Sequence, residues 1–174
     1  MIISVEEAKK LVDVSGWTDE KLERKLKAIE KTIRKYTNNE FKEYACRTAA
    51  VISGSRICCA DLMPFKVGDT VQISKSSFND GLYTITSIAD YELTFAETVK
   101  DEEVVLVTLV QYPEDIVDCA LNLLEWDVKN RQKVGIKSET LSRHSVTYED
   151  SASMFNGYPK GILSSASLHR KARC

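Results

Sequence analysis

The chain has 174 residues and a formal net charge of −2, with 43% hydrophobic and 29% charged residues. The length suits one domain, or one domain that carries an insert, and the fractions are typical of a soluble globular protein. No apolar run approaches the roughly 20 residues that cross a bilayer. The first residues also lack the pattern of a secretory signal. The sequence therefore predicts neither a membrane protein nor a secreted one.

Charge is distributed unevenly along the chain. Residues 46–112 have 5 basic and 9 acidic side chains, whereas residues 160–174 have 4 basic and 0 acidic ones. A protein that binds nucleic acid with most of its surface normally has a larger basic excess. We expect the basic C-terminal tail to meet an acidic surface.

The first helix is predicted to begin at Ser4. Ser4 and Glu7 match the capping box, in which the two residues satisfy each other's unpaired backbone N–H groups. Gly16 is predicted to end this element. One apolar face follows the cap and consists of Val5, Ala8, Leu11 and Val12.

The second helix is predicted to start after Thr18, with Asn38 and Asn39 suited to its end. One face is apolar, and the other faces are mostly basic. The basic faces favour either a solvated helix surface or a surface that meets nucleic acid or an acidic partner. The apolar residues are Leu22, Leu26, Ile29, Ile33 and Tyr36, and the basic ones are Lys21, Arg24, Lys25, Lys27, Lys31, Arg34 and Lys35.

Residues 46–112 are predicted to form a small antiparallel barrel or sandwich. Asp80-Gly81 is a signal for a tight hairpin. Phe65–Val71 and Asn79–Ile85 resemble the opening strands of SH3-like barrels, some of which bind nucleic acid. The acidic charge of this segment argues against that use and favours contact with protein or a spacer role. Strands are predicted around Ala49–Ile52, Val67–Ile73, Asn79–Ile85, Tyr91–Phe95 and Val104–Val110.

A third helix is predicted from Pro113, with Glu114 and Asp115 at the end that the helix dipole favours for acids and Gly135 at its other end. The remaining residues are predicted to lie beyond the core, as a strand, a turn at Gly157–Pro159 and a short basic helix. The apolar stripe of the third helix consists of Ile116, Val117, Ala120, Leu121, Leu124 and Val128.

The predicted fold class is α+β. A small helical bundle, with three main helices plus a C-terminal strand and short helix, is expected from residues 1–45 and 113–174. An antiparallel, SH3-like barrel is expected as an insert at residues 46–112, leaving and returning at nearby points of the bundle.

No motif of known chemistry is present. The two histidines, His144 and His169, belong to no catalytic signature. The five cysteines have no metal-binding spacing and fit reduced thiols better than a disulfide framework. The acidic run Asp101–Glu103 fits a solvated hairpin tip better than a metal site. We therefore expect no enzyme, no cofactor and no metal site, and an enzyme with an unrecognised site is the least favoured alternative.

The C-terminal segment carries a family resemblance. Ser138–Leu141, Ser145–Glu149, Tyr158-Pro159 and a helix that ends in basic residues resemble the C-terminal pattern of head–tail connector (adaptor) proteins of long-tailed bacteriophages and their prophages. The paired N-terminal helices and the helix entered through Pro113 are similar to the same family. The resemblance covers residues 1–45 and 113–174, and the barrel is an addition to the smallest members.

This resemblance implies a structural role in the virion neck. Such adaptors are made in the host cytoplasm and form a ring, commonly of twelve subunits, between the portal protein and the stopper or tail-completion protein, around double-stranded DNA that passes through without sequence-specific binding. It implies a neighbour-pairing strand and a portal-contacting tail, with Tyr158 and Pro159 also in the docking segment. The strand residues are Ser145, Val146, Thr147, Tyr148 and Glu149, and the tail includes Leu168, Arg170, Lys171 and Arg173. The alternative is a nucleic-acid-binding module that uses the basic second helix and the small barrel.

Overall fold

The computed structural model describes residues 1–61, 63–130, 138–141, 144–147 and 153–172. The fold is α+β, and the described residues include four α-helices and a closed six-stranded antiparallel barrel. The chain divides into two compact units. One consists of Met1 with Glu40–Gln111, and the other of Ile2–Asn39 with Tyr112–Cys174. Gly135, the predicted end of the third helix, lies outside the described residues.

The first unit is the barrel. Its strands are ordered β1-β2-β5-β4-β3-β6, and β6 closes the barrel on β1. Buried and exposed side chains alternate along β1 from Thr48 to Ser53, as expected for a strand with one face turned into a barrel. The strands are β1 (Lys42–Ser53), β2 (Arg56–Cys59), β3 (Thr70–Ser74), β4 (Gly81–Ala89), β5 (Glu92–Phe95) and β6 (Glu102–Val110).

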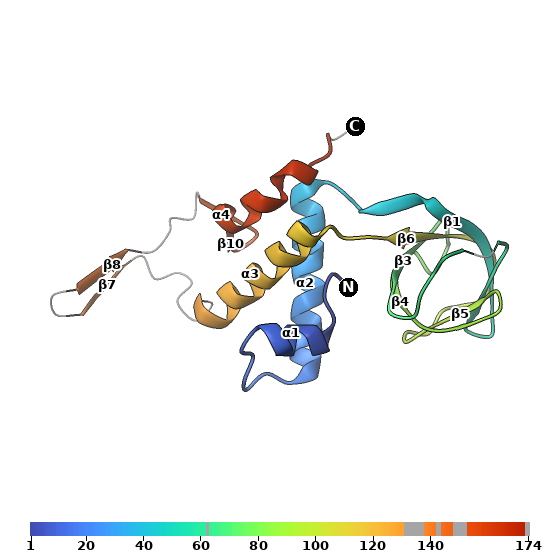
Figure 1. Ribbon diagram of the computed structural model, residues 1–174, viewed down its shortest axis with the longest axis horizontal. Coiled ribbons are helices and arrows are strands. Elements are labelled where there is room, and N and C mark those ends of the chain that lie inside the picture. The colour runs from blue at the N-terminus through green and yellow to red at the C-terminus, as the bar shows by residue number, and fades with distance from the viewer. Residues whose placement is uncertain (62, 131–137, 142–143, 148–152, 173–174) are drawn as a thin grey trace. The chain divides into compact units, whose positions relative to one another are not determined.

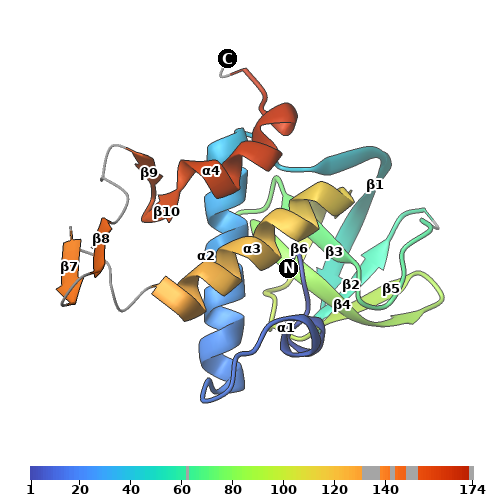
Figure 2. The ribbon, with the colours of Figure 1, turned by 60° about the vertical axis from the view of Figure 1, so that its left-hand side comes forward.

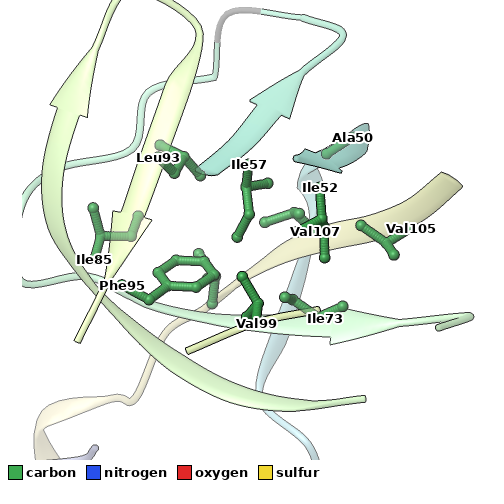
Figure 3. Packing of buried hydrophobic residues seen from close by; sticks show 11 residues of the cluster. Ala50, Ile52, Ile57, Ile73, Ile85, Leu93, Phe95, Val99, Val105 and Val107 are labelled. Atoms are coloured by element: carbon green, nitrogen blue, oxygen red, sulfur yellow. The ribbon is translucent and has the colours of Figure 1, made fainter. Parts of the chain in front are cut away.

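Side chains from all six strands fill the barrel interior (Figure 3). Ile57, Val71, Ile73 and Val105 are completely buried there. Phe95 stacks on Tyr83 with ring centroids 5.0 Å apart. The interior is therefore a packed apolar core.

The barrel begins and ends at one place. Lys42 pairs with Val110 across β1 and β6, and the Gln111 N–H donates to the Phe41 carbonyl at 3.0 Å. The expectation that the insert leaves and returns at nearby points is therefore confirmed.

The predicted tight turn at Asp80-Gly81 is wrong. β3 ends at Ser74 and β4 begins at Gly81, so the connection has six residues. It begins at Lys75, whose φ is +60°, and Asp80 accepts a hydrogen bond from the Ser76 N–H at 2.9 Å. Asp80 therefore closes a longer loop through its side chain.

Glu102 holds this loop against the start of β6. Its carboxylate accepts hydrogen bonds from the Ser76 hydroxyl, the Ser77 N–H and the Asn79 side-chain amide. The Ser76 bond is the main cause that lowers the pKa of Glu102. The acidic run Asp101–Glu103, predicted to be a solvated hairpin tip, thus includes a carboxylate that orders a loop.

The second unit contains the helices α1 (Val5–Leu11), α2 (Asp19–Thr37), α3 (Glu114–Asn130) and α4 (Lys160–Leu163), followed by a 3₁₀ helix, η3 (Ser164–His169). Both ribbon views show α3 crossing α2 (Figures 1 and 2). Two short hairpins complete it, β7 (Ser138–Leu141) with β8 (His144–Thr147), and β9 (Met154–Phe155) with β10 (Tyr158–Pro159).

The first helix ends at Leu11, with Val12 as its C-cap, so its predicted end at Gly16 is wrong. Capping residues set the beginnings of α1 and α2 and the end of α2 as predicted. Ser4 and Glu7 form both bonds of the capping box. The Thr18 hydroxyl accepts from the Lys21 N–H, and Asn38 ends α2 with a left-handed φ of 49°. The predicted stripe of α2 is confirmed, since Leu22, Leu26, Ile29 and Ile33 are buried and Tyr36 is half-buried. Leu11, predicted on the apolar face of α1, is instead 62% exposed at the end of that helix.

We expected the C-terminal segment to lie beyond the core, and this expectation is wrong. Tyr158, Pro159, Leu163 and Ala166 are all buried. Leu163 and Ala166 are three residues apart and therefore share one face of the α4–η3 segment, which packs on α2 and α3. This segment is part of the helical core.

Truncation of one core leucine should show this directly. Leu163→Ala is expected to lower the free energy of unfolding by about 2–5 kcal/mol, because the lost methyl groups leave a cavity. Leu168→Ala removes the same atoms from a side chain that is 89% exposed. It is expected to change the free energy of unfolding by less than about 0.5 kcal/mol. Urea unfolding followed by circular dichroism measures both variants. Equal losses would contradict the assignment of Leu163 to the core.

Candidate docking segment

The hairpin β9–β10 places the C-terminal segment on α2. Its turn consists of Asn156 and Gly157, which have φ values of 52° and 81°, so the turn predicted at Gly157–Pro159 begins one residue earlier. The Asn156 amide donates to the Thr32 hydroxyl at 2.8 Å. Phe155 packs edge-on against Tyr36 with ring centroids 5.3 Å apart.

Tyr158 forms the most buried polar contact of the segment. Its hydroxyl donates to Asp127 Oδ2 at 2.5 Å, and Lys25 Nζ lies 3.4 Å from the same oxygen. Trp126 packs edge-on against the Tyr158 ring with centroids 5.7 Å apart. Asp127 is 2% exposed, and a buried carboxylate is tolerated only when it is hydrogen-bonded or paired. Tyr158 and Lys25 together satisfy that requirement.

A second buried carboxylate fixes the beginning of α3 to α2. The Tyr112 hydroxyl donates to Glu30 Oε1 at 2.6 Å. Burial is the main cause that raises the pKa of Tyr112, and the charge of Glu30 adds to it. Tyr112 is therefore a permanent donor to Glu30.

The 3₁₀ helix η3 is held to α3 by a hydrogen bond between two side chains. His169 Nε2 lies 2.6 Å from Asp115 Oδ2. This hydrogen bond is the main cause that lowers the pKa of Asp115. The Cys119 thiol, near the same helix end, donates to the Ile162 carbonyl at 3.6 Å. Burial raises the pKa of Cys119, so this thiol stays protonated and its role is packing.

The chain beyond η3 is bound to the end of α2. The Lys171 N–H donates to the Thr37 carbonyl at 2.8 Å. The Asn38 amide donates to the Ala172 carbonyl at 3.0 Å, and the Asn39 amide to the His169 carbonyl at 3.2 Å. Backbone carbonyls accept the two amide bonds, so they fix the path of the tail with little demand on its side chains.

Leu168 is the most exposed large apolar side chain of the described residues, at 89%. Arg170 follows it and stacks over the Tyr36 ring, 5.3 Å from the centroid. An open pocket at Arg170 is lined by Tyr36, Asn38, Arg170, Lys171 and Ala172. An apolar side chain followed by two cations is thus displayed by a segment whose backbone is fixed.

The residues predicted for partner contact fall into three groups. Leu168, Arg170 and Lys171 are exposed, whereas Tyr158 and Pro159 are buried and hold the segment in place. The third group comprises Ser145, Val146 and Thr147, which lie in β8 and pair with Thr140, Glu139 and Ser138 of β7. Tyr148, Glu149 and Arg173 lie outside the described residues.

Sequence reasoning named Tyr158 and Pro159 for partner contact, and missed the other residues that anchor this segment. Asp127 was not singled out, because one acidic residue late in a helix usually faces solvent. Leu163 and Ala166 had a usable signal, since apolar residues three apart are typical of a buried helical face.

The described residues contain no group of three or more His, Cys, Asp or Glu side chains placed to hold a metal ion. In the same part of the chain, no helix combines the length and the apolar character needed to cross a bilayer. Comparisons with protein-family models and with curated proteins found no match for the chain.

Removal of one hydroxyl tests the buried contact. Tyr158→Phe keeps the ring but removes one hydrogen-bond donor from the buried Asp127 carboxylate, and we expect a loss of about 1–3 kcal/mol in the free energy of unfolding. Tyr36→Phe is the matched control, because no hydrogen bond of its hydroxyl is found among the described residues. Chemical denaturation of both variants provides the measurement, and a neutral Tyr158→Phe would refute the role of this bond.

The pair of Asp115 and His169 predicts an acid dependence of stability. Because the pKa of Asp115 is lower in the folded protein than its ordinary value of 3.8, the ionised carboxylate stabilises the fold above that pH, and this contribution is lost as pH falls through the folded pKa. We expect wild type to be more stable than Asp115→Asn near neutral pH. The difference should shrink below about pH 4. Unfolding free energies measured across this range check it, and a difference independent of pH would count against the pair.

Proposed function

We propose that this chain is a structural head–tail adaptor of a tailed-phage virion. It assembles into a ring, commonly of twelve copies, below the portal and joins the capsid to the stopper or tail-completion protein. Double-stranded DNA passes through the ring without sequence-specific binding. In this proposal the protein is made in the host cytoplasm, resides in the virion neck and catalyses no reaction. Its helical unit is a small bundle of three main helices with an inserted SH3-like barrel.

The observation that carries the proposal is the fixed C-terminal segment with its exposed Leu168. Buried anchors at Tyr158, Leu163 and Ala166 order the segment, while its outer side offers one apolar side chain and the cations of Arg170 and Lys171. Full burial of a leucine in a partner contributes about 1.5–3 kcal/mol. The adjacent cations add orientation and a preference for an acidic partner surface. We assign this surface to contact with the portal.

The hairpin β7–β8 supports contact between neighbouring subunits. β7 occupies one edge of β8 along Ser145–Thr147, so a strand from a neighbour would add at the other edge. Pairing of this kind uses backbone hydrogen bonds and places few demands on sequence. An isolated two-stranded hairpin is marginally stable in water, which also favours further pairing on assembly.

Substitution at the exposed surface tests portal docking without damage to the fold. Leu168→Asp combined with Arg170→Glu is expected to abolish binding to the portal ring of the phage, while circular dichroism stays that of wild type. Lys10→Glu combined with Lys129→Glu provides a control for added acidic charge on other exposed positions. Deletion of residues 160–174 is unsuitable because it removes Leu163 and Ala166 from the core.

Electron microscopy of the protein mixed with portal rings provides the readout. The proposal requires a ring of adaptor subunits at the portal exit, its absence from the Leu168→Asp/Arg170→Glu mixture and its presence with the control. If wild type never forms a ring on the portal, the adaptor function is wrong. If the surface variant docks as well as wild type, the ring stands but the docking segment is misassigned.

A further inference from the structure

The exposed face of α2 carries a continuous basic stripe. Lys21, Arg24, Ala28, Lys31 and Lys35 are all exposed, and their spacing of three, four, three and four residues places them on one side of the helix. That side is opposite the buried face of Leu22, Leu26, Ile29 and Ile33. At 1.5 Å per residue the stripe is about 21 Å long.

The stripe differs from the other cations of α2, which have partners within the unit. Lys25 pairs with Asp127, and Lys27 pairs with Glu23. No ion pair among the described residues involves Arg24, Lys31 or Lys35, and Lys21 lies over the Trp17 ring at 4.3 Å. Two acidic residues of the helix are engaged elsewhere: Asp19 pairs with Lys9, and Glu30 accepts from Tyr112. Glu20, in the first turn and four residues before Arg24, lies beside the beginning of the stripe.

The composition of the stripe selects the class of partner. A protein–protein interface needs an apolar or aromatic centre, and the only apolar member here is Ala28. Contact with a phosphate backbone needs positive charge alone. The stripe also lacks an exposed aromatic platform on which single-stranded bases would stack, because Lys21 covers Trp17. Its chemistry therefore fits the backbone of a nucleic-acid duplex.

We propose that the stripe formed by Lys21, Arg24, Lys31 and Lys35 binds the phosphate backbone of duplex DNA without regard to sequence. Contacts of Lys and Arg with phosphate oxygens carry no sequence information, and the stripe has no Asn or Gln that would read adenine. Three or four phosphate contacts give weak, salt-sensitive binding. Such contacts orient a duplex and release it readily. This inference stands independently of the adaptor function.

The test measures salt dependence with a fluorescent random-sequence DNA duplex, by anisotropy on the full-length protein. With three to four contacts, the logarithm of the binding constant should fall with the logarithm of salt concentration with a slope of about −2.7 to −3.6. The triple variant Arg24→Gln/Lys31→Gln/Lys35→Gln should lose most of the affinity and flatten this slope by about 2.7. Thermal unfolding of the variant confirms that the fold is intact.

The control variant Lys10→Gln/Lys66→Gln/Lys75→Gln removes the same net charge from exposed residues that are not members of the stripe. It should keep nearly all of the affinity and the slope of wild type. Equal losses in the two variants would show an effect of net charge and overturn the assignment. The absence of wild-type binding to DNA at low salt would also overturn the assignment, because that is the result expected if this helix face is only solvated. Binding of polyglutamate but not duplex DNA, lost in the stripe variant, would assign the face to an acidic protein instead.

Discussion

The hydrogen bond between Tyr158 and the buried carboxylate of Asp127 is the interaction on which the candidate docking segment depends. A carboxylate that is 2% exposed destabilises the fold unless donors surround it. Tyr158 and Lys25 supply them from positions far apart in the chain. The contact therefore fixes which part of the C-terminal segment lies against α3. Leu163 and Ala166 are buried a few residues further along the chain, whereas Leu168 is 89% exposed.

The barrel interrupts the helical unit in sequence at little energetic cost. Because Lys42 pairs with Val110 and Gln111 bonds to Phe41, the two ends of the insert are already held together by its own sheet. The helical segments on either side are thus joined by a closed structure, which carries a smaller entropic cost than a flexible loop of the same length. Tyr112, the first residue after the barrel, then bonds to Glu30 of α2, which ties the returning chain to the helical unit.

Local patterns were sufficient to predict much of the fold. The capping box at Ser4, the stripe of α2 and the antiparallel β-insert follow from periodicity and capping chemistry, and the structure confirms them. β2 was missed because four residues containing Cys58 and Cys59 carry little periodic signal. The loop at residues 75–80 was misread because Asp80 closes it through a side-chain bond. The anchoring of the C-terminal segment depends on a contact between Tyr158 and Asp127, which sequence spacing alone does not encode.

The candidate site, too, could be predicted only in part from the sequence. The basic tail and the basic face of α2 are visible in the sequence, whereas the division of their side chains into buried anchors and displayed groups needs the packed structure. The central claim is that the docking segment is ordered before it meets a partner. Hydrogen–deuterium exchange on the free protein tests this most directly, at the amide of Lys171 that bonds to Thr37 and at those of residues 160–170. Protection comparable to that of α2 and α3 is the predicted result, and exchange at the rate of an unfolded chain would contradict the account.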